Sequence, residues 1–171
     1  MLHPGRVMLA AVVLLAALIS YLSFGAQPTT ADASRETPHL KFTATVSPRV
    51  VTPGEPFTLA IDVAPKPGMH VYAPGSKYRP IRITIEPQTS LTIKNAVYPK
   101  ATPYYFKPLN ETVDVYASPF RLLVEMSVAA STQAPASMTL DGALEYQACD
   151  DRECFLPESI PLRWTLSLKK S

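Results

Sequence analysis

The chain has 171 residues, of which 47% are hydrophobic, so it suits a single folded domain and wholesale disorder is excluded. Sixteen basic residues against fourteen acidic ones give a formal net charge of +2, and nothing in this balance favours a nucleic acid or an acidic partner. The chain contains only two cysteines and three histidines.

The first predicted element is an apolar leader at the N-terminus. Residues 7–24 form one unbroken apolar run, and Arg6 precedes it, as in an export signal. The run is also just long enough to span a bilayer, so the sequence predicts either a cleaved signal peptide over residues 1–25 or an uncleaved membrane anchor. Small residues suit cleavage after Gly25 or after Ala33. Both alternatives place the rest of the chain outside the cytoplasm, where disulfides can persist.

A linker and a series of strands are predicted next. Residues 26–39 are polar, contain proline and lack periodicity, which indicates a flexible linker, and the folded domain is expected over residues 40–171. Beyond the linker, apolar and polar residues alternate in short segments, as in strands with one buried face. The clearest segments are residues 57–63, 81–86, 120–128 and 160–168, and the weaker ones are residues 40–46, 91–98 and 138–147.

These strands predict an all-β fold, an immunoglobulin-like antiparallel β-sandwich. The 18 prolines fit loops and strand edges, whereas helix interiors would not tolerate them. The usual immunoglobulin pattern, two distant cysteines with a tryptophan between them, is absent, because Cys149 and Cys154 are five positions apart and Trp164 follows both. Such a fold is compatible with very many functions, so the fold class alone does not decide the function.

Both cysteines lie in the sequence YQACDDRECFLPE, between the last two predicted strands. The arms of this hairpin would bring the thiols of Cys149 and Cys154 within the distance that a disulfide requires. A structural disulfide, a metal site and a redox-active pair are the three alternatives. Closing a loop of about six residues stabilises a fold by roughly 2 kcal/mol, against nearly 5 for about a hundred residues, so a purely structural bond would be poorly placed here.

A metal site would need more ligands than this region offers. The two thiolates and His70 give at most three plausible donors, and no spacing indicates a closed zinc site. Copper could add Met69 as a ligand, but His70 is expected to be a loop residue that packs beside Tyr72. No metal and no other cofactor is therefore predicted.

A redox role requires an accessible pair whose reactivity is set by local charge. The acidic side chains of Asp150, Asp151 and Glu153 disfavour a thiolate, and Arg152 partly offsets them. We expect the reduced pair to stay largely protonated and unreactive until a partner protein docks.

The residues around the cysteines resemble those of a known family. The sequence YQAC at residues 146–149, followed by Cys154 and Pro157, is similar to the motif of the N-terminal periplasmic domain of the DsbD thiol:disulfide interchange proteins, an immunoglobulin-like redox module. The segment PKPGMHVYAPG, residues 65–75, resembles a loop of the same domains. The resemblance covers roughly residues 40–168.

The resemblance implies that Cys149 and Cys154 exchange electrons with partner proteins through mixed disulfides and without a cofactor, with Cys154 attacking and Cys149 resolving. The implied partners are periplasmic thioredoxin-like proteins and a separate membrane electron-donor protein, and the family also suggests a link to cytochrome c biogenesis. Residues 7–24 would then hold the domain at the inner membrane, unless the leader is cleaved. The alternative is a non-catalytic binding or structural domain whose short disulfide only pins the last hairpin.

Members of the family also cover their cysteines with an aromatic cap loop, and the counterpart is expected within residues 99–116. Here Tyr104, Tyr105 and Phe106 form an apolar cluster that would shield the disulfide until a partner displaces it, although one or two of these rings could instead fill the core. Further residues expected at the partner-docking surface are Tyr146, Asp150, Asp151, Arg152 and Glu153.

Overall fold

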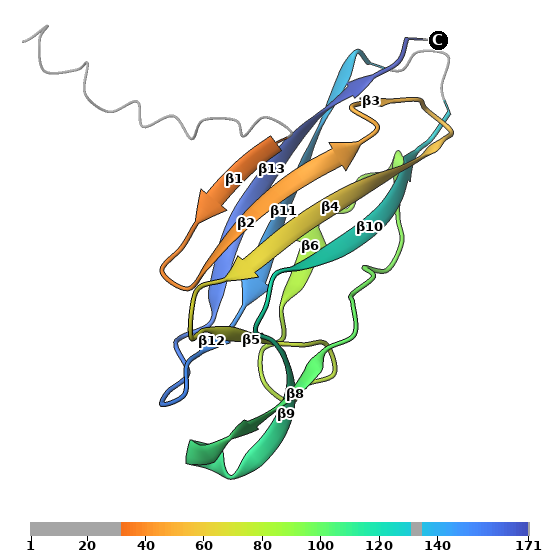
Figure 1. Cartoon of the computed structure of the whole chain (residues 1–171). Helices are drawn as coiled ribbons and strands as arrows, with labels where there is room; N and C mark the ends of the chain where they lie inside the picture. The colour runs from red at the N-terminus through yellow and green to blue at the C-terminus, as the bar shows by residue number, and fades with distance from the viewer. Residues whose placement is uncertain (1–31, 131–134, 171) are drawn as a thin grey trace, which may run out of the picture.

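The structure, a computed structural model, describes residues 32–130 and 135–170. The predicted leader over residues 1–25 lies outside these ranges, so its cleavage or anchoring stays a prediction. Within the described ranges, no helix is long and apolar enough to cross a membrane. The described residues form an all-β, sandwich-like fold with its strands running along one long axis (Figure 1).

One layer is a five-stranded antiparallel sheet in the order β1-β2-β4-β10-β7. The central strand β4 shows how the sequence produces it, because every second side chain from Phe57 to Val63 is at most 2% exposed and so faces the interior. The bounds of the strands are Asp32–Glu36 for β1, Leu40–Ser47 for β2, Pro56–Pro65 for β4, Leu91–Ile93 for β7 and Phe120–Val128 for β10.

The second layer is a four-stranded sheet in the order β3-β13-β11-β6, in which β3 runs parallel to β13 and the other neighbours are antiparallel. Inward side chains of both layers, among them Leu140, Leu144 and Trp164, form one apolar core. The strands of this layer are β3 (Val50–Val51), β6 (Arg82–Ile85), β11 (Ser137–Tyr146) and β13 (Glu158–Leu168).

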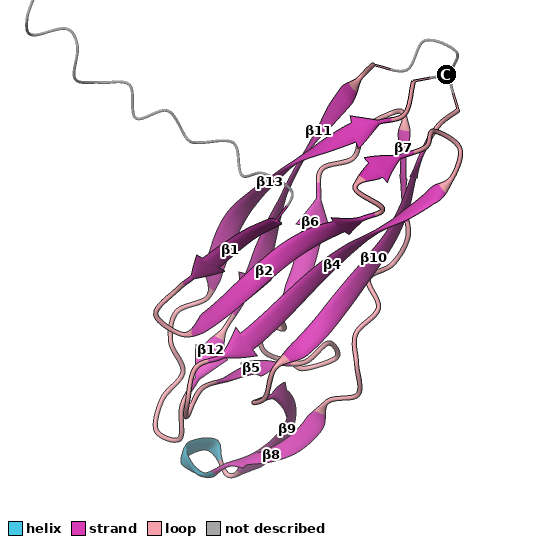
Figure 2. Cartoon of the chain, turned by 45° about the horizontal axis from the view of Figure 1, so that its top comes forward, coloured by secondary structure: helices cyan, strands magenta, loops and turns pink. Residues whose placement is uncertain are grey.

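A third, smaller sheet, β12-β5-β9-β8, lies at the end of the sandwich opposite the C-terminus (Figure 1). It consists of β12 (Ala148–Cys149), β5 (His70–Tyr72), β9 (Glu111–Tyr116) and β8 (Thr102–Phe106). A single 3-10 turn, η1 (Lys107–Leu109), joins β8 to β9 and is the only helical element in the described ranges (Figure 2). We call residues 102–116 the aromatic hairpin.

All seven predicted strands occur, as β2, β4, β6, β7, β10, β11 and β13. Two other expectations were wrong. The predicted linker, residues 26–39, contains β1, which pairs with β2 along all of β1, so the folded chain begins upstream of Leu40. His70 lies in β5 and not in a loop. Within residues 99–116, where the cap loop is expected, residues 102–106 and 111–116 form a two-stranded hairpin. Backbone hydrogen bonds at the edges and ends of the sheets hold these short strands in place. Because such bonds do not depend on the side chains, the sequence shows little alternation of apolar and polar residues there.

Candidate functional site

Cys149 and Cys154 form a disulfide at the tip of the hairpin made by β11 and β13. The two strands pair as far as Tyr146 and Glu158, and the chain between them, residues 147–157, is the cysteine loop. The predicted position of the thiols at the end of the last hairpin is therefore confirmed. Cys149 belongs to β12, so the loop is also joined to the third sheet through β5.

Asp150 organises the turn between the two cysteines. Its Oδ1 accepts hydrogen bonds from the backbone N–H of Arg152 at 2.8 Å and of Glu153 at 2.9 Å. These two amides hold the pKa of Asp150 below its ordinary value, so the carboxylate stays charged near neutral pH. The side chains of Asp151, Arg152 and Glu153 are exposed at the tip of the loop, where the sequence placed them.

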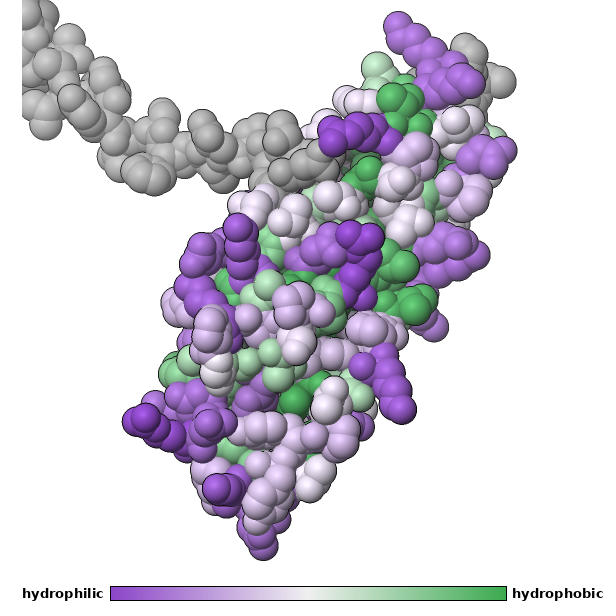
Figure 3. All heavy atoms as spheres, in the orientation of Figure 1, coloured by the Kyte–Doolittle hydropathy of each residue, from purple (hydrophilic) through white to green (hydrophobic). Residues whose placement is uncertain are grey.

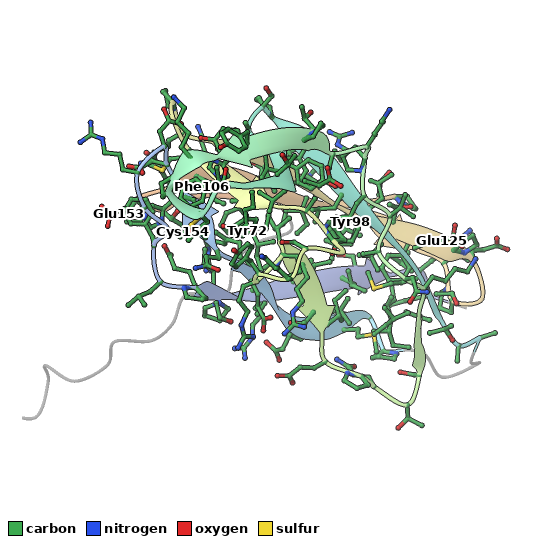
Figure 4. All side chains as sticks on the ribbon, turned by 90° about the horizontal axis from the view of Figure 1, so that it is seen from below. Tyr72, Tyr98, Phe106, Glu125, Glu153 and Cys154 are labelled. Carbon is green, nitrogen blue, oxygen red and sulfur yellow. A yellow bond between two sulfur atoms is a disulfide. The ribbon has the colours of Figure 1, made fainter. Side chains whose placement is uncertain are left out.

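The two sulfurs differ in their access to solvent. Cys149 is 0% exposed and belongs to a small apolar cluster, whereas Cys154 is only partly buried and packs at the edge of that cluster. Figure 4 shows Cys154 at this end of the molecule, between Glu153 and Tyr72. A second protein can therefore reach Cys154 before Cys149.

Tyr72, which lies on β5, places its hydroxyl against both sulfurs, 3.2 Å from Cys154 Sγ and 3.3 Å from Cys149 Sγ. Disulfide sulfurs carry no proton, so the tyrosine O–H is the donor in both contacts. The ring is 1% exposed and stacks on Tyr78, with 4.7 Å between the ring centroids. Burial is the main cause that raises the pKa of Tyr72 to about 12, so the hydroxyl remains a donor at neutral pH.

His70 is the residue directly opposite Cys149 in the pairing of β5 with β12. Its side chain is 3% exposed, its ring lies 4.3 Å from the ring of Tyr104, and its buried Nε2 has no hydrogen-bond partner. Burial lowers the pKa of His70, and the charges of Asp151 and Asp150 act in the opposite direction. The sequence suggests His70 only as a metal ligand or as a neighbour of Tyr72, because no local pattern pairs β5 with the cysteine loop.

The three rings of the aromatic hairpin lie in three different environments. Tyr104 packs against the cluster that contains Cys149, and its hydroxyl donates a hydrogen bond of 2.6 Å to Asp151 Oδ1 in the cysteine loop. Tyr105 is 53% exposed, and its hydroxyl donates to Asn110 within the hairpin. Phe106 is 3% exposed, and its ring lies 6.5 Å from that of His70. Of the three, Tyr104 connects the hairpin directly to the cysteine loop.

The turn end of the aromatic hairpin is held by Glu111, the first residue of β9. Its carboxylate accepts a hydrogen bond from the hydroxyl of Tyr78 and pairs with the ammonium of Lys77. The interactions with Lys77 and then Tyr78 lower the pKa of Glu111. Since Tyr78 also stacks on Tyr72, this group connects the hairpin to the side chain that contacts the disulfide.

Tyr146 was predicted to belong to the docking surface, and the structure corrects this prediction. The alternation of β11 turns it inward with Leu144, so it is 1% exposed and belongs to the main core. Its hydroxyl lies 2.8 Å from the hydroxyl of Thr37, ahead of β2. A docked partner cannot contact Tyr146 without opening the core, because its side chain packs inside the core where the cysteine loop begins.

Leu156 is a surface residue that the sequence analysis missed. It is 87% exposed, the highest value among the large apolar side chains of the described residues, and it lies two positions after Cys154. In the sequence it looks like part of an apolar run with Phe155, whose ring instead packs against His39 at 4.4 Å. Figure 3 shows that the visible face of this end of the molecule is otherwise covered mainly by hydrophilic and weakly polar residues.

No group of three or more His, Cys, Asp or Glu side chains in residues 32–130 and 135–170 is arranged to hold a metal ion. The reactive group that the structure shows at this site is the disulfide, set between a tyrosine hydroxyl, a buried imidazole and an acidic turn.

The fold and this site define a class of small β-sandwich domains with a disulfide in a terminal loop beneath an aromatic hairpin. A family model described as thiol:disulfide interchange protein DsbD, N-terminal, matches residues 38–161. The chain belongs to this family. No curated protein sequence matches the chain significantly.

The solved structures with a similar fold include two N-terminal domains. The N-terminal periplasmic domain of ScsB from Proteus mirabilis is 17% identical with a TM-score of 0.52, and the match covers 78% of this chain and 51% of that one. The N-terminal domain of DsbD from Neisseria meningitidis in the reduced form is 14% identical with a TM-score of 0.44, covering 64% of this chain and 75% of that one. The chain thus spans about half the length of the ScsB domain, and the likeness to it supports the sandwich fold.

Proposed function

We propose that this domain exchanges disulfides for thiols with partner proteins outside the cytoplasm, using Cys149 and Cys154 as its redox pair. The observation that carries the proposal is the asymmetry of the pair, because Cys149 is 0% exposed while Cys154 reaches the surface. A structural crosslink needs no accessible sulfur, whereas an exchange module needs one sulfur at which a partner can attack or be attacked. Membership of the DsbD N-terminal family agrees with this role.

In the reducing direction, the thiolate of Cys154 attacks one sulfur of the partner's disulfide and expels the partner's second sulfur as a thiolate. The product is a mixed disulfide between Cys154 and the partner. Cys149 then loses its proton and attacks Cys154 Sγ, which releases the partner's first sulfur and forms the Cys149–Cys154 disulfide. Two electrons have passed to the partner, and a donor restores the dithiol by the reverse steps.

The aromatic hairpin would act as the cap of this site. Tyr104 and the ring of Tyr72 lie around the buried side of the disulfide, and the hydrogen bond from Tyr104 to Asp151 fixes the hairpin on the cysteine loop. A partner that displaces this hairpin would expose the sulfurs, while small thiols in solution would be kept away. Phe106 would support the cap from inside, because it is buried.

The docking surface would surround Cys154. The exposed apolar side chain of Leu156 supplies a contact of the kind found at the centre of interfaces, and Tyr105 offers a second exposed ring on the hairpin. The exposed charges of Asp151, Arg152 and Glu153 would select the partner and steer its approach. Thioredoxin-like proteins as acceptors, a separate membrane protein as donor, a role in cytochrome c biogenesis and a leader that tethers the domain remain parts of this proposal.

The first experiment is the midpoint reduction potential of the cysteine pair in the purified protein, measured by thiol trapping across a graded redox buffer. A midpoint between roughly −180 and −270 mV, the range of working thiol oxidoreductases, would support electron exchange. A midpoint well below about −300 mV would indicate a bond that stays closed, and the domain would then be a structural or binding module.

The second experiment replaces both cysteines by serine and measures folding and exchange separately. An exchange module keeps its fold and loses all electron transfer. A structural module instead loses stability, by roughly 2 kcal/mol for a loop of this length, and keeps its partner binding.

A further inference from the structure

We propose that His70 is the proton acceptor of Cys149, so that the buried thiol can become a thiolate in the resolving step. The inference rests on the proposed exchange reaction. It gives a role in that reaction to His70, which has none in the steps described above. It concerns the one step that solvent cannot assist, since Cys149 is 0% exposed.

The first argument is the geometry of the third sheet. His70 and Cys149 are directly opposite in an antiparallel pair, and such residues project from the same face with their Cβ atoms about 4.5–5.5 Å apart. Tyr72 lies two positions further along β5 and so projects from this face as well. Its hydroxyl is 3.2 Å and 3.3 Å from the two sulfurs, so this face of β5 is directed at the disulfide.

The second argument is the unsatisfied nitrogen. Nε2 of His70 is buried without a hydrogen-bond partner, which is uncommon for a buried polar atom. The oxidised pair offers it no donor, because disulfide sulfurs carry no hydrogen. Reduction creates an S–H group at Cys149, opposite His70. The dithiol state therefore supplies the donor that the disulfide state lacks.

The third argument is the charge around the ring. The titratable groups that face His70 are the hydroxyl of Tyr72 on its own strand, Tyr104 on β8, and the carboxylates of Asp150 and Asp151 in the cysteine loop. Burial lowers the pKa of His70 and keeps the imidazole neutral, as a base must be. The two carboxylates favour the imidazolium once it forms, and the pKa of Tyr104, raised to about 12, keeps this phenol protonated.

The proposed step balances as follows. In the mixed disulfide, the proton of Cys149 S–H moves to Nε2 of His70, and the resulting thiolate attacks Cys154 Sγ. The bond between Cys154 and the partner breaks, and its electron pair leaves on the partner's sulfur. The imidazolium then gives its proton to the departing thiolate of the partner, so His70 ends the step neutral.

The test measures the thiolate of Cys149 directly. In a Cys154→Ser protein only one thiol remains, and its ultraviolet absorbance is titrated against pH with and without His70→Phe, which keeps a ring beside Tyr104. We expect at least about tenfold less thiolate at neutral pH in the double variant. His70→Gln can accept a hydrogen bond but cannot take a proton, so we expect it not to restore the thiolate.

His39→Phe is the matched control, because His39 also packs on the cysteine loop but has its Nδ1 engaged with Glu158 at 2.6 Å. It should leave the titration of Cys149 unchanged. The rate of the resolving step is measured in parallel, in the reduced two-cysteine protein with Ellman's reagent. Attack by Cys154 releases the first thionitrobenzoate, and the resolving step releases the second. In His70→Phe the rate of the second release should fall about tenfold, while that of the first does not change.

The inference is overturned if Cys149 titrates alike with histidine and with glutamine at position 70, and this comparison also decides the matter if His70→Phe does not fold. The midpoint potential of the parent pair distinguishes a failure of this inference from a failure of the proposed function. If the parent pair has a midpoint in the working range but is insensitive to His70, only this inference fails. If the parent midpoint marks a permanently closed bond, the proposed function fails, whatever the titration shows.

Discussion

Replacing Tyr104 by phenylalanine tests whether the aromatic hairpin controls access to the disulfide. The change removes only the hydroxyl that donates to Asp151 at 2.6 Å, and it leaves the ring that packs against the cluster around Cys149. The hydroxyl pKa of about 12, raised mainly by this hydrogen bond, means that the donor is present throughout the neutral range. The effect should therefore be the same from pH 6 to pH 9 or thereabouts.

The magnitude follows from the exposure of the bond. Buried hydrogen bonds to a charged group contribute about 1.5–3 kcal/mol, but this bond is exposed to solvent, so a net contribution of about 1 kcal/mol is the appropriate expectation. If opening of the hairpin precedes reduction and is fast, 1 kcal/mol raises the open fraction about fivefold. Tyr104→Phe should thus be reduced by dithiothreitol about five times faster than the parent.

Tyr105→Phe is the matched control, since its hydroxyl bonds to Asn110 inside the same hairpin and not to the cysteine loop. Its reduction rate should change by less than about twofold. If Tyr104 and Asp151 act through one hydrogen bond, a double variant that also carries Asp151→Ala should be reduced no faster than the faster of the two single variants. A double-mutant cycle measures this coupling. Equal rates for the Tyr104 variant, the Tyr105 variant and the parent would refute the idea that this bond holds the cap.

Three further predictions concern the surroundings of the disulfide and the fold. Tyr72→Phe removes a donor that favours the thiolate state, so the midpoint potential measured in redox buffers should become more negative by roughly 20 mV; an unchanged or less negative value would contradict this. Gly142→Ala would place a Cβ 2.3 Å from the carbonyl oxygen of Thr84, so chemical denaturation should show a loss of about 1–3 kcal/mol, and an unchanged midpoint would count against this packing. Glu111 has a lowered pKa because of Lys77, so its contribution is present above its unfolded value of 4.5 and is lost as the pH falls through the lower folded value. Thermal unfolding of Glu111→Gln should therefore be less sensitive to acid than that of the parent, and an equal loss in both would contradict the assignment.

The sequence determined the layers of the sandwich because each long strand records its buried face in its own residues. Alternation in residues 57–63 and 120–128 fixes which side chains enter the core, and the structure buries them as β4 and β10. The cysteine loop was equally visible, since both thiols and the acidic turn are contiguous in the chain. The resemblance to the DsbD family rests mainly on these contiguous residues, together with the segment of residues 65–75, and the family match confirms it.

Only the tertiary structure decided what surrounds the sulfurs. Tyr72 contacts Cys149 across 77 positions, and Tyr104 contacts Asp151 across 47, through pairings of strands only two to six residues long. Strands this short contain too few residues for apolar and polar positions to show a clear alternation. Alternation also indicates which side chains are buried, but not which strands are neighbours in a sheet. For that reason the sequence identified the cysteine pair, while the tyrosine hydroxyl, the imidazole and the aromatic hairpin that surround it are visible only in the fold.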